Sequence, residues 1–201
     1  MNRERIGNLT VCLGLTVLLI GMSWGSAHAQ TKLEKPLSGG TIKITKSGSY
    51  FLGANLPTGL LVGPAIGVST GVNNVTINLN GFSIIGPGGI GSAAGINASS
   101  SSGVTIVNGT ITKIAGKGVV LGSNSTVAGV QLIGNSGDGL TCTSGCLVTS
   151  NIINGNTGTG LNFLDSTSGY QNNIIVPGLG GSTVAGGTNM GHNVCGIALC
   201  P

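Results

Sequence analysis

The sequence predicts an all-β solenoid, in which short strands wind into stacked coils of about 21 residues. Two sets of columns at a 21-residue step support this prediction, and the composition, with 39 glycines, 6% charged and 3% aromatic residues, supports it as well. Three columns are apolar: Ile111, Leu132, Ile153 and Ile174; Val119, Leu140 and Leu161; and Leu121, Cys142 and Phe163. Two are glycine columns: Gly116, Gly137 and Gly158; and Gly118, Gly139 and Gly160. Small β-branched residues stack in register, and glycines form the corners.

Residues 1–29 have the pattern of a secretory signal peptide. Arg3 and Arg5 precede an apolar run from Leu9 to Ile20, and Ala27-His28-Ala29 matches the A-x-A cleavage pattern. A membrane span needs about 20 apolar residues, and this run is shorter. We therefore expect a secreted or periplasmic chain with no membrane span after signal removal.

Residues 30–58 are expected to form an N-terminal linker and cap. A short polar linker covers 31–37, and strands at 41–45 and 50–52 follow, because Ile42 and Ile44 alternate with polar residues. These strands would cover the open end of the solenoid. Lys43 and Lys46 fit edge charges that keep other chains from pairing there.

Residues 59–185 are expected to form the solenoid body, with about five to six coils. The strand at 75–79 has its next copy at 104–106, which lies further along the chain than the 21-residue step places it. The surplus falls in the loop-like stretches 86–91 and 99–102, and such loops are where solenoids usually bind ligands. Asn135 and Asn156 share a column just before a glycine corner, which favours an asparagine ladder over a ligand-binding row.

Residues 186–201 break the period and are expected to form a C-terminal cap closed by a disulfide. Cys142, Cys146, Cys195 and Cys200 remain after processing, and an even count in an exported chain indicates two disulfides. Three connectivities are open, and proximity in sequence favours Cys142–Cys146 with Cys195–Cys200. A metal site is the alternative, but the spacing is unusual for zinc and only His192 could join the cysteines. We therefore expect no metal and no cofactor.

The charge balance argues against one class of partner. After residue 29 there are six lysines and three carboxylates, a net charge of +3, and four of the six lysines precede residue 47. No basic stripe with interleaved aromatic residues is present, so we expect no nucleic-acid binding. The sequence does not indicate an oligomeric state.

Three stretches carry a family resemblance. The run Asn-Asn-Val-Thr-Ile-Asn-Leu-Asn-Gly-Phe at 73–82, the stretch 48–56 and the ending Gly-His-Asn-Val-Cys at 191–195 resemble right-handed parallel β-helix repeat proteins of the pectin-lyase-like superfamily. The resemblance covers about residues 40–200 and implies a right-handed parallel β-helix. It does not imply an activity, because the superfamily includes lyases, hydrolases, epimerases and proteins without known chemistry.

The enzymes of that superfamily would need residues that this chain lacks. The resemblance implies for lyases a carboxylate cluster that holds Ca²⁺ and a basic residue, commonly arginine, and no arginine follows Arg5. Hydrolases need two or three carboxylates within reach of one glycosidic bond, roughly 5 to 9.5 Å apart. The candidates in the body are Asp138 and Asp165, but the 21-residue step places Asp165 above Ser144, about 20 Å along the coil from Asp138.

Both carboxylates also have a structural interpretation. The same step places Asp138 beside Lys117, which favours a surface ion pair. Asp165 has the sequence surroundings of a turn residue that binds nearby amides. We therefore expect an exported, non-catalytic protein that binds a polysaccharide or a cell-surface component or serves as a structural or surface-active module. The alternative is a polysaccharide lyase or glycoside hydrolase, which would need Asp138, Asp165 or Glu34 to be brought together.

Overall fold

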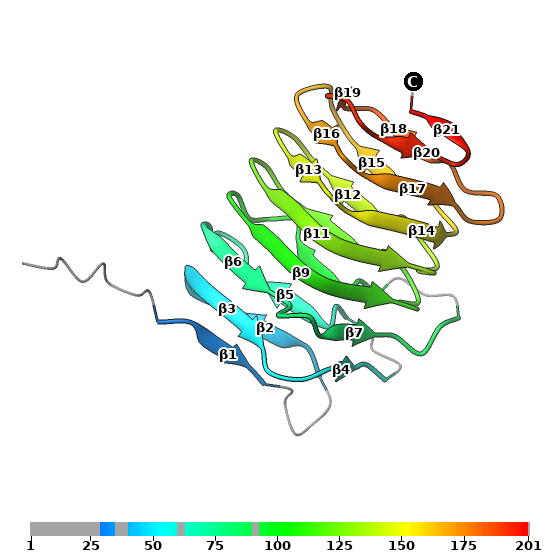
Figure 1. Cartoon of the computed structure of the whole chain (residues 1–201). Helices are drawn as coiled ribbons and strands as arrows, with labels where there is room; N and C mark the ends of the chain where they lie inside the picture. Colours follow the sequence, from blue (N-terminus) through cyan, green and yellow to red (C-terminus); the bar gives the residue numbers. More distant parts are fainter. Residues whose placement is uncertain (1–28, 35–39, 60–62, 90–92, 201) are drawn as a thin grey trace, which may run out of the picture.

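The computed structural model of the protein describes residues 29–34, 40–59, 63–89 and 93–200. These residues form a parallel β-solenoid, and no helix occurs among them (Figure 1). The described ranges accordingly contain no helical segment long and apolar enough to cross a bilayer. The signal-peptide prediction for residues 1–29 falls almost entirely outside the described residues.

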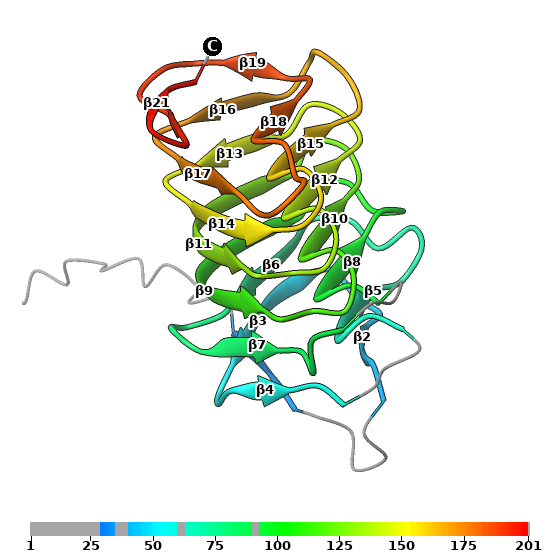
Figure 2. The same ribbon diagram turned by 90° about the vertical axis from the view of Figure 1, so that its right-hand side faces the viewer.

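Each coil crosses three walls, which Figure 2 shows from the side. We call the seven-stranded sheet wall 3. Its order from the C-terminal end is β18 (Val184–Ala185), β15 (Leu161–Phe163), β12 (Leu140–Cys142), β10 (Val119–Leu121), β8 (Ile96–Ala98), β5 (Ile66–Val68) and β2 (Ile42–Ile44). All six pairings within it are parallel.

The fourteen-stranded sheet forms the other two walls. Wall 1 holds β1 (Thr31–Leu33), β3 (Gly48–Leu52), β6 (Val75–Asn78), β13 (Leu147–Thr149), β16 (Gly169–Gln171) and β19 (Thr188–Asn189). Wall 2 holds β4 (Leu56–Pro57), β7 (Ser83–Ile85), β14 (Ile152–Asn156), β17 (Ile174–Pro177), β20 (Val194–Cys195) and β21 (Ala198–Leu199). The long strands β9 (Thr105–Thr112) and β11 (Thr126–Ile133) cross both walls. The pair β20–β21 is antiparallel, unlike every other pair described.

A left-handed backbone residue stands at the bend between walls 1 and 2 in five successive coils. The five residues are in register and have φ between 57° and 64°: Asn108, Gly129, Ser150, Asn172 and His192. Asparagine tolerates this conformation better than most residues, and glycine adopts it without strain. The bend therefore explains why polar residues interrupt the apolar alternation at these positions.

The predicted apolar columns line the core. Val119, Leu140 and Leu161 pair in register and are fully buried. Ile111, Leu132 and Ile153 do the same, but the fourth member of this column is Ile175 instead of the Ile174 that the strict step predicts. The corner between β15 and β16 contains one residue more than the corner between β12 and β13. The step from β14 to β17 is therefore one position longer than the preceding one, and Ile174 faces outward.

The N-terminal strands join the stack instead of lying across it. The expected strands at 41–45 and 50–52 are present as β2 and β3, and each pairs in parallel with the next coil. Residues 31–33, expected within a linker, form β1 and pair with β3. Wall 3 consequently has seven strands, and the five to six expected coils become about seven. Lys43 lies on β2, the edge strand of wall 3, as the edge-charge interpretation predicts.

Candidate functional site

The most strongly bonded polar cluster surrounds Asp138, at the corner where wall 2 leads into wall 3. Lys117 Nζ lies 3.0 Å from Asp138 Oδ2, which confirms the predicted ion pair. Thr141 Oγ1 donates to the same oxygen at 2.9 Å and accepts from Lys117 at 3.0 Å. Asn162 Nδ2 also donates to Oδ2, and the Thr159 amide donates to Oδ1. The coil of Asp138 and the coils on either side of it thus supply four donors to one carboxylate.

These bonds determine the protonation state of Asp138. Burial raises the pKa of the carboxyl, but its hydrogen-bond donors, first among them Asn162, together outweigh burial and hold the pKa below its ordinary value. The side chain is only 14% exposed, and about four lone-pair positions are the full accepting capacity of a carboxylate. A carboxylate held ionised in this way is poorly suited to donate a proton as a general acid.

The second candidate carboxylate lies away from the first. Asp138 precedes β12 and Asp165 follows β15, so the two stand at opposite ends of neighbouring wall 3 strands. Asp165 accepts from the amide of Thr167 at 3.1 Å and from its hydroxyl at 2.9 Å, as predicted for a turn residue. Glu34, at the other end of the chain, pairs with Lys32 at 3.3 Å. The structure does not bring these carboxylates together.

The predicted asparagine ladder is present and buried. Asn135 donates its Nδ2 and its backbone amide to Asn156 Oδ1, at 2.9 and 3.0 Å. Asn156 in turn donates to the carbonyl oxygen of Leu132. Both side chains are almost fully buried, so this column serves the core and not a ligand.

A second ladder lies at the bend between walls 1 and 2. It consists of Asn151, Asn173 and Asn193, and each asparagine donates to the Oδ1 of the next at 2.9 to 3.0 Å. The sequence interpretation missed it, because its steps of 22 and 20 differ from the dominant one. The signal in the sequence that could have found it is that each of these three asparagines directly precedes a short apolar run.

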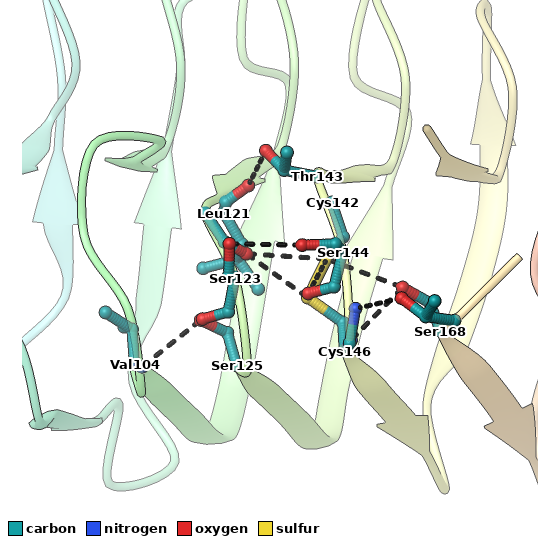
Figure 3. Close-up of a disulfide and its surroundings, with 12 residues drawn as sticks. Val104, Leu121, Ser123, Ser125, Cys142, Thr143, Ser144, Cys146 and Ser168 are labelled. Atoms are coloured by element: carbon teal, nitrogen blue, oxygen red, sulfur yellow. Dashed lines mark hydrogen bonds between the residues drawn. A yellow bond between two sulfur atoms is a disulfide. The ribbon is translucent and has the colours of Figure 1, made fainter. Parts of the chain in front are cut away.

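The two disulfides are Cys142–Cys146 and Cys195–Cys200, which confirms the local pairing. Figure 3 shows the first, which links the end of β12 to Cys146, the residue before β13, across the corner between walls 3 and 1. Both of its cysteines are buried. Cys146 stands in one inward column between Ser125 and Ser168, and the Ser168 hydroxyl accepts from the Cys146 amide at 3.1 Å.

The metal alternative has no ligand set in the described part of the chain. No group of three or more histidine, cysteine, aspartate or glutamate side chains gathers there. His192 is exposed and occupies the left-handed bend position between walls 1 and 2. The cysteines that it was considered to join are held in disulfides.

A hydroxyl-lined groove lies along the corner between walls 3 and 1. Its volume is about 210 Å³. The lining consists of Asn73, Ser99, Ser100, Ser101, Ser102, Gly122, Ser123 and Thr143. We call it the serine groove. No charged side chain lines it, and every lining residue except Gly122 carries a side-chain hydrogen-bonding group.

The serine groove contains only one of the two surplus loops. β8 separates 86–91 from 99–102, so the two stretches flank wall 3 on opposite sides. Ser99 to Ser102 belong to the groove, whereas the described residues 86–89 do not. Residues 90–92 lie outside the described ranges. The loop prediction therefore identified one side of the groove and could not identify the neighbouring coils that complete it.

Four hydroxyl residues form a regular row on the outer surface of wall 1: Ser49, Thr76, Thr105 and Thr126. The sequence steps between its members are unequal, which hides this row from a search at a fixed period. In the column of Ser83 and Thr110 on wall 2, Gln131 and Ile152 follow Thr110, so no regular threonine column holds at the 21-residue step, as the sequence predicts.

Neither a protein-family model nor a curated protein nor a solved structure matches the chain. The fold alone therefore defines the class, which is that of the parallel β-solenoid proteins. Two disulfides are typical of proteins that reside in an oxidising, extracytoplasmic environment.

Proposed function

We propose that the chain is an exported, non-catalytic β-solenoid of the pectin-lyase-like kind that binds a neutral polysaccharide in the serine groove. The lining of the groove carries the proposal: Ser99, Ser100 and Ser102 on one coil lie beside Ser123 and Thr143 on the next two coils. Hydroxyl groups both donate and accept, so they match the hydroxyls of a sugar. Export is supported by the signal-peptide pattern and by the two disulfides.

The size and charge of the groove narrow the ligand class. A volume of 210 Å³ corresponds to roughly seven water molecules at about 30 Å³ each, which suits one sugar ring of a longer chain. An acidic polysaccharide would require cationic partners, and the lining has none. On the adjoining outer surface of wall 3, Asn97 adds an amide against which a further sugar unit could rest.

Hydrogen bonds and not aromatic stacking would hold the sugar. Phe163 and Tyr170 are buried and stack on each other, with ring centroids 5.8 Å apart. Tyr50, Phe51 and Phe82 are half-buried and lie outside the groove lining. We therefore expect weak binding per sugar unit, which a repeating polymer would strengthen through multiple contacts.

The test is a glycan-array screen of the purified protein against neutral and acidic polysaccharides, with product release read in the same wells. Titration calorimetry of the best neutral ligand then compares the wild type with a triple variant, Ser99→Ala, Ser100→Ala and Ser102→Ala. Loss of two or three hydrogen bonds of about 1 kcal/mol each predicts a roughly tenfold or larger weakening.

The matched control is Ser166→Ala, an exposed serine at the same corner in a later coil, which should leave the affinity unchanged. Equal affinity of the triple variant and the wild type would contradict the proposed site. Product release would support the lyase or hydrolase alternative and direct attention back to Asp138 and Asp165. If no neutral glycan binds, the proposal is rejected.

A further inference from the structure

The exposed apolar side chains of the described residues are gathered at the C-terminal end of the solenoid. All eight large ones lie between residues 152 and 199: Ile152, Leu164, Ile174, Leu179, Met190, Val194, Ile197 and Leu199. The sequence after Asp165 contains no lysine, arginine, aspartate or glutamate. The N-terminal coils, in contrast, carry Lys32, Lys43 and Lys46. The two ends of the solenoid therefore differ in both charge and polarity.

Four of these side chains form one continuous row on the outer surface of wall 2. Ile152 pairs with Ile174, Ile174 with Val194, and Val194 with Leu199. Their exposed fractions are 41%, 48%, 37% and 75%, respectively. Figure 1 shows their strands side by side, from β14 to β21. At about 4.8 Å per strand the row is about 14 Å long, and we call it the wall 2 apolar row.

The row is a local property of the last coils. In the same column the earlier coils place Ser83, Thr110 and Gln131, which are polar. The additional residue in the corner between β15 and β16 turns Ile174 outward, and the core loses nothing because Ile175 replaces it. A solvated surface gains nothing from four aligned apolar side chains, whereas contiguous exposed apolar residues mark interaction surfaces.

We propose that a second copy of this chain covers the wall 2 apolar row, with the two walls packed face to face about a twofold axis. A row of this kind is self-complementary, as a twofold interface requires. No charged residue lies near it in sequence, so two copies meet without like-charge repulsion, whereas lysines at the other end oppose association there. The proposal is independent of glycan binding, because the serine groove lies at the corner between walls 3 and 1.

The area of the row sets the strength of the dimer. Its four side chains together expose about as much surface as two free residues, on the order of 350 Å² per copy, so the row alone buries about 700 Å² in a pair. Flanking Gln131 and Asn154, both exposed, bring the interface toward about 1,000 Å², the low end for specific complexes. The dimer should therefore be reversible and concentration-dependent.

A lipid surface fits the row less well. Membrane-interface segments combine apolar residues with lysine, arginine, tryptophan or tyrosine at their borders. Asp165 is the last charged residue, and Tyr170, the last aromatic residue, is buried. The surroundings of the row therefore lack the groups that hold a protein at a headgroup layer.

Sedimentation equilibrium from micromolar to millimolar protein tests the proposal. The average mass of the wild type should rise toward that of two chains, and Ile174→Lys should remain monomeric, with a dissociation constant raised roughly tenfold or more. Thr110→Lys, in the same column at its polar end, is the matched control and should dimerise like the wild type. Ile152→Lys is the second variant if Ile174→Lys shows a reduced melting temperature.

Three outcomes would overturn the proposal. These are a wild type that stays monomeric throughout, lysine variants in the row that dimerise as well as the wild type, and a monomer that cosediments with neutral phosphatidylcholine vesicles. The last would assign the row to a membrane. The Cys195–Cys200 disulfide holds β21, and with it Leu199, against β20. Its reduction should therefore raise the dissociation constant of the dimer, by the same factor for the wild type and for Thr110→Lys.

Discussion

Buried asparagines satisfy the backbone at two bends of the later coils, with Asn135 and Asn156 at one bend and Asn151, Asn173 and Asn193 at the other. In each ladder the Oδ1 accepts from both the amide and the side chain of the asparagine one coil earlier, and the Nδ2 donates to a backbone carbonyl. An apolar residue at these positions would leave buried donors without partners, which costs about 1–3 kcal/mol for each group. The described part of the chain contains no buried side-chain nitrogen or oxygen without a hydrogen bond.

We predict that Asn156→Ala lowers the free energy of unfolding by about 2–4 kcal/mol, because the amide and the Nδ2 of Asn135 both lose their acceptor. Urea unfolding measured by circular dichroism provides the value. Asn154→Ala, on the same strand but exposed, should change it by about 0.5 kcal/mol or less. Equal effects of the two substitutions would show that the ladder contributes no stability.

The two ladders also show which residue contacts can be predicted from the sequence and which cannot. Asn135 and Asn156 share the dominant step, so their column could be predicted. Asn151, Asn173 and Asn193 do not share it, because each corner can add or drop one residue without disturbing the strands. The partners of Asp138 divide in the same way: Lys117 follows from the step, whereas Asn162 depends on side-chain reach.

At the scale of the element, the first disulfide occupies a place that hydroxyl groups fill in neighbouring coils. Ser125 accepts from the amide of Val104, and Ser168 accepts from the amide of Cys146 (Figure 3). Cys146 stands between them in the same inward column. A serine at position 146 would therefore present its hydroxyl to the amide of Ser125 and restore a continuous hydroxyl column.

We predict that Cys142→Ala with Cys146→Ser is more stable than Cys142→Ala with Cys146→Ala. Removal of the disulfide, which closes a short loop, should cost both variants about 2 kcal/mol. The serine variant should recover about 1 kcal/mol through the new buried hydrogen bond. Thermal unfolding of the three proteins under oxidising conditions measures the difference, and an alanine variant at least as stable as the serine variant would contradict the column.

The strands whose inward faces could be predicted are those that corners of constant length keep at the 21-residue step. β10, β12 and β15 follow the dominant step, so their inward and outward faces were predicted correctly. The 21-residue step places Ile174 in the core. Ile174 and Ile175 are identical in type, so nothing in the sequence shows that Ile175 is the one that faces inward. β1 was missed since three residues provide too little alternation, and its pairing with β3 arises only when the stack exists.

At the scale of the whole molecule, stability should add up coil by coil, because each coil touches only its neighbours. We predict that deletion of residues 105–125 leaves a folded solenoid with one coil fewer. The deletion joins Val104 to Thr126 and transfers the partners of β9 and β10 to β11 and β12 in the same register. The β-sheet circular dichroism per residue should persist, and the urea m-value should fall with the surface buried.

Deletion of residues 105–114 alone is the matched control. It removes fewer residues, but β10 then lacks the wall 1 and wall 2 strand segments of its own coil. The chain therefore cannot complete that coil. We expect this shorter deletion to unfold or aggregate. Should it prove as stable as the whole-coil deletion, the coil would not be the unit of stability.

The short sequence distance between paired strands has a consequence for how the molecule is made. Every parallel rung finds its partner in chain that was synthesised shortly before it, so a nascent polypeptide can add rungs in the order of its emergence, with little waiting for distant segments. β21 departs from this order, because it folds back antiparallel on β20, its immediate neighbour in the sequence. Each rung before it needs a full coil of chain between partners, whereas this last pair of the described strands can form as a local hairpin as soon as its own residues have emerged.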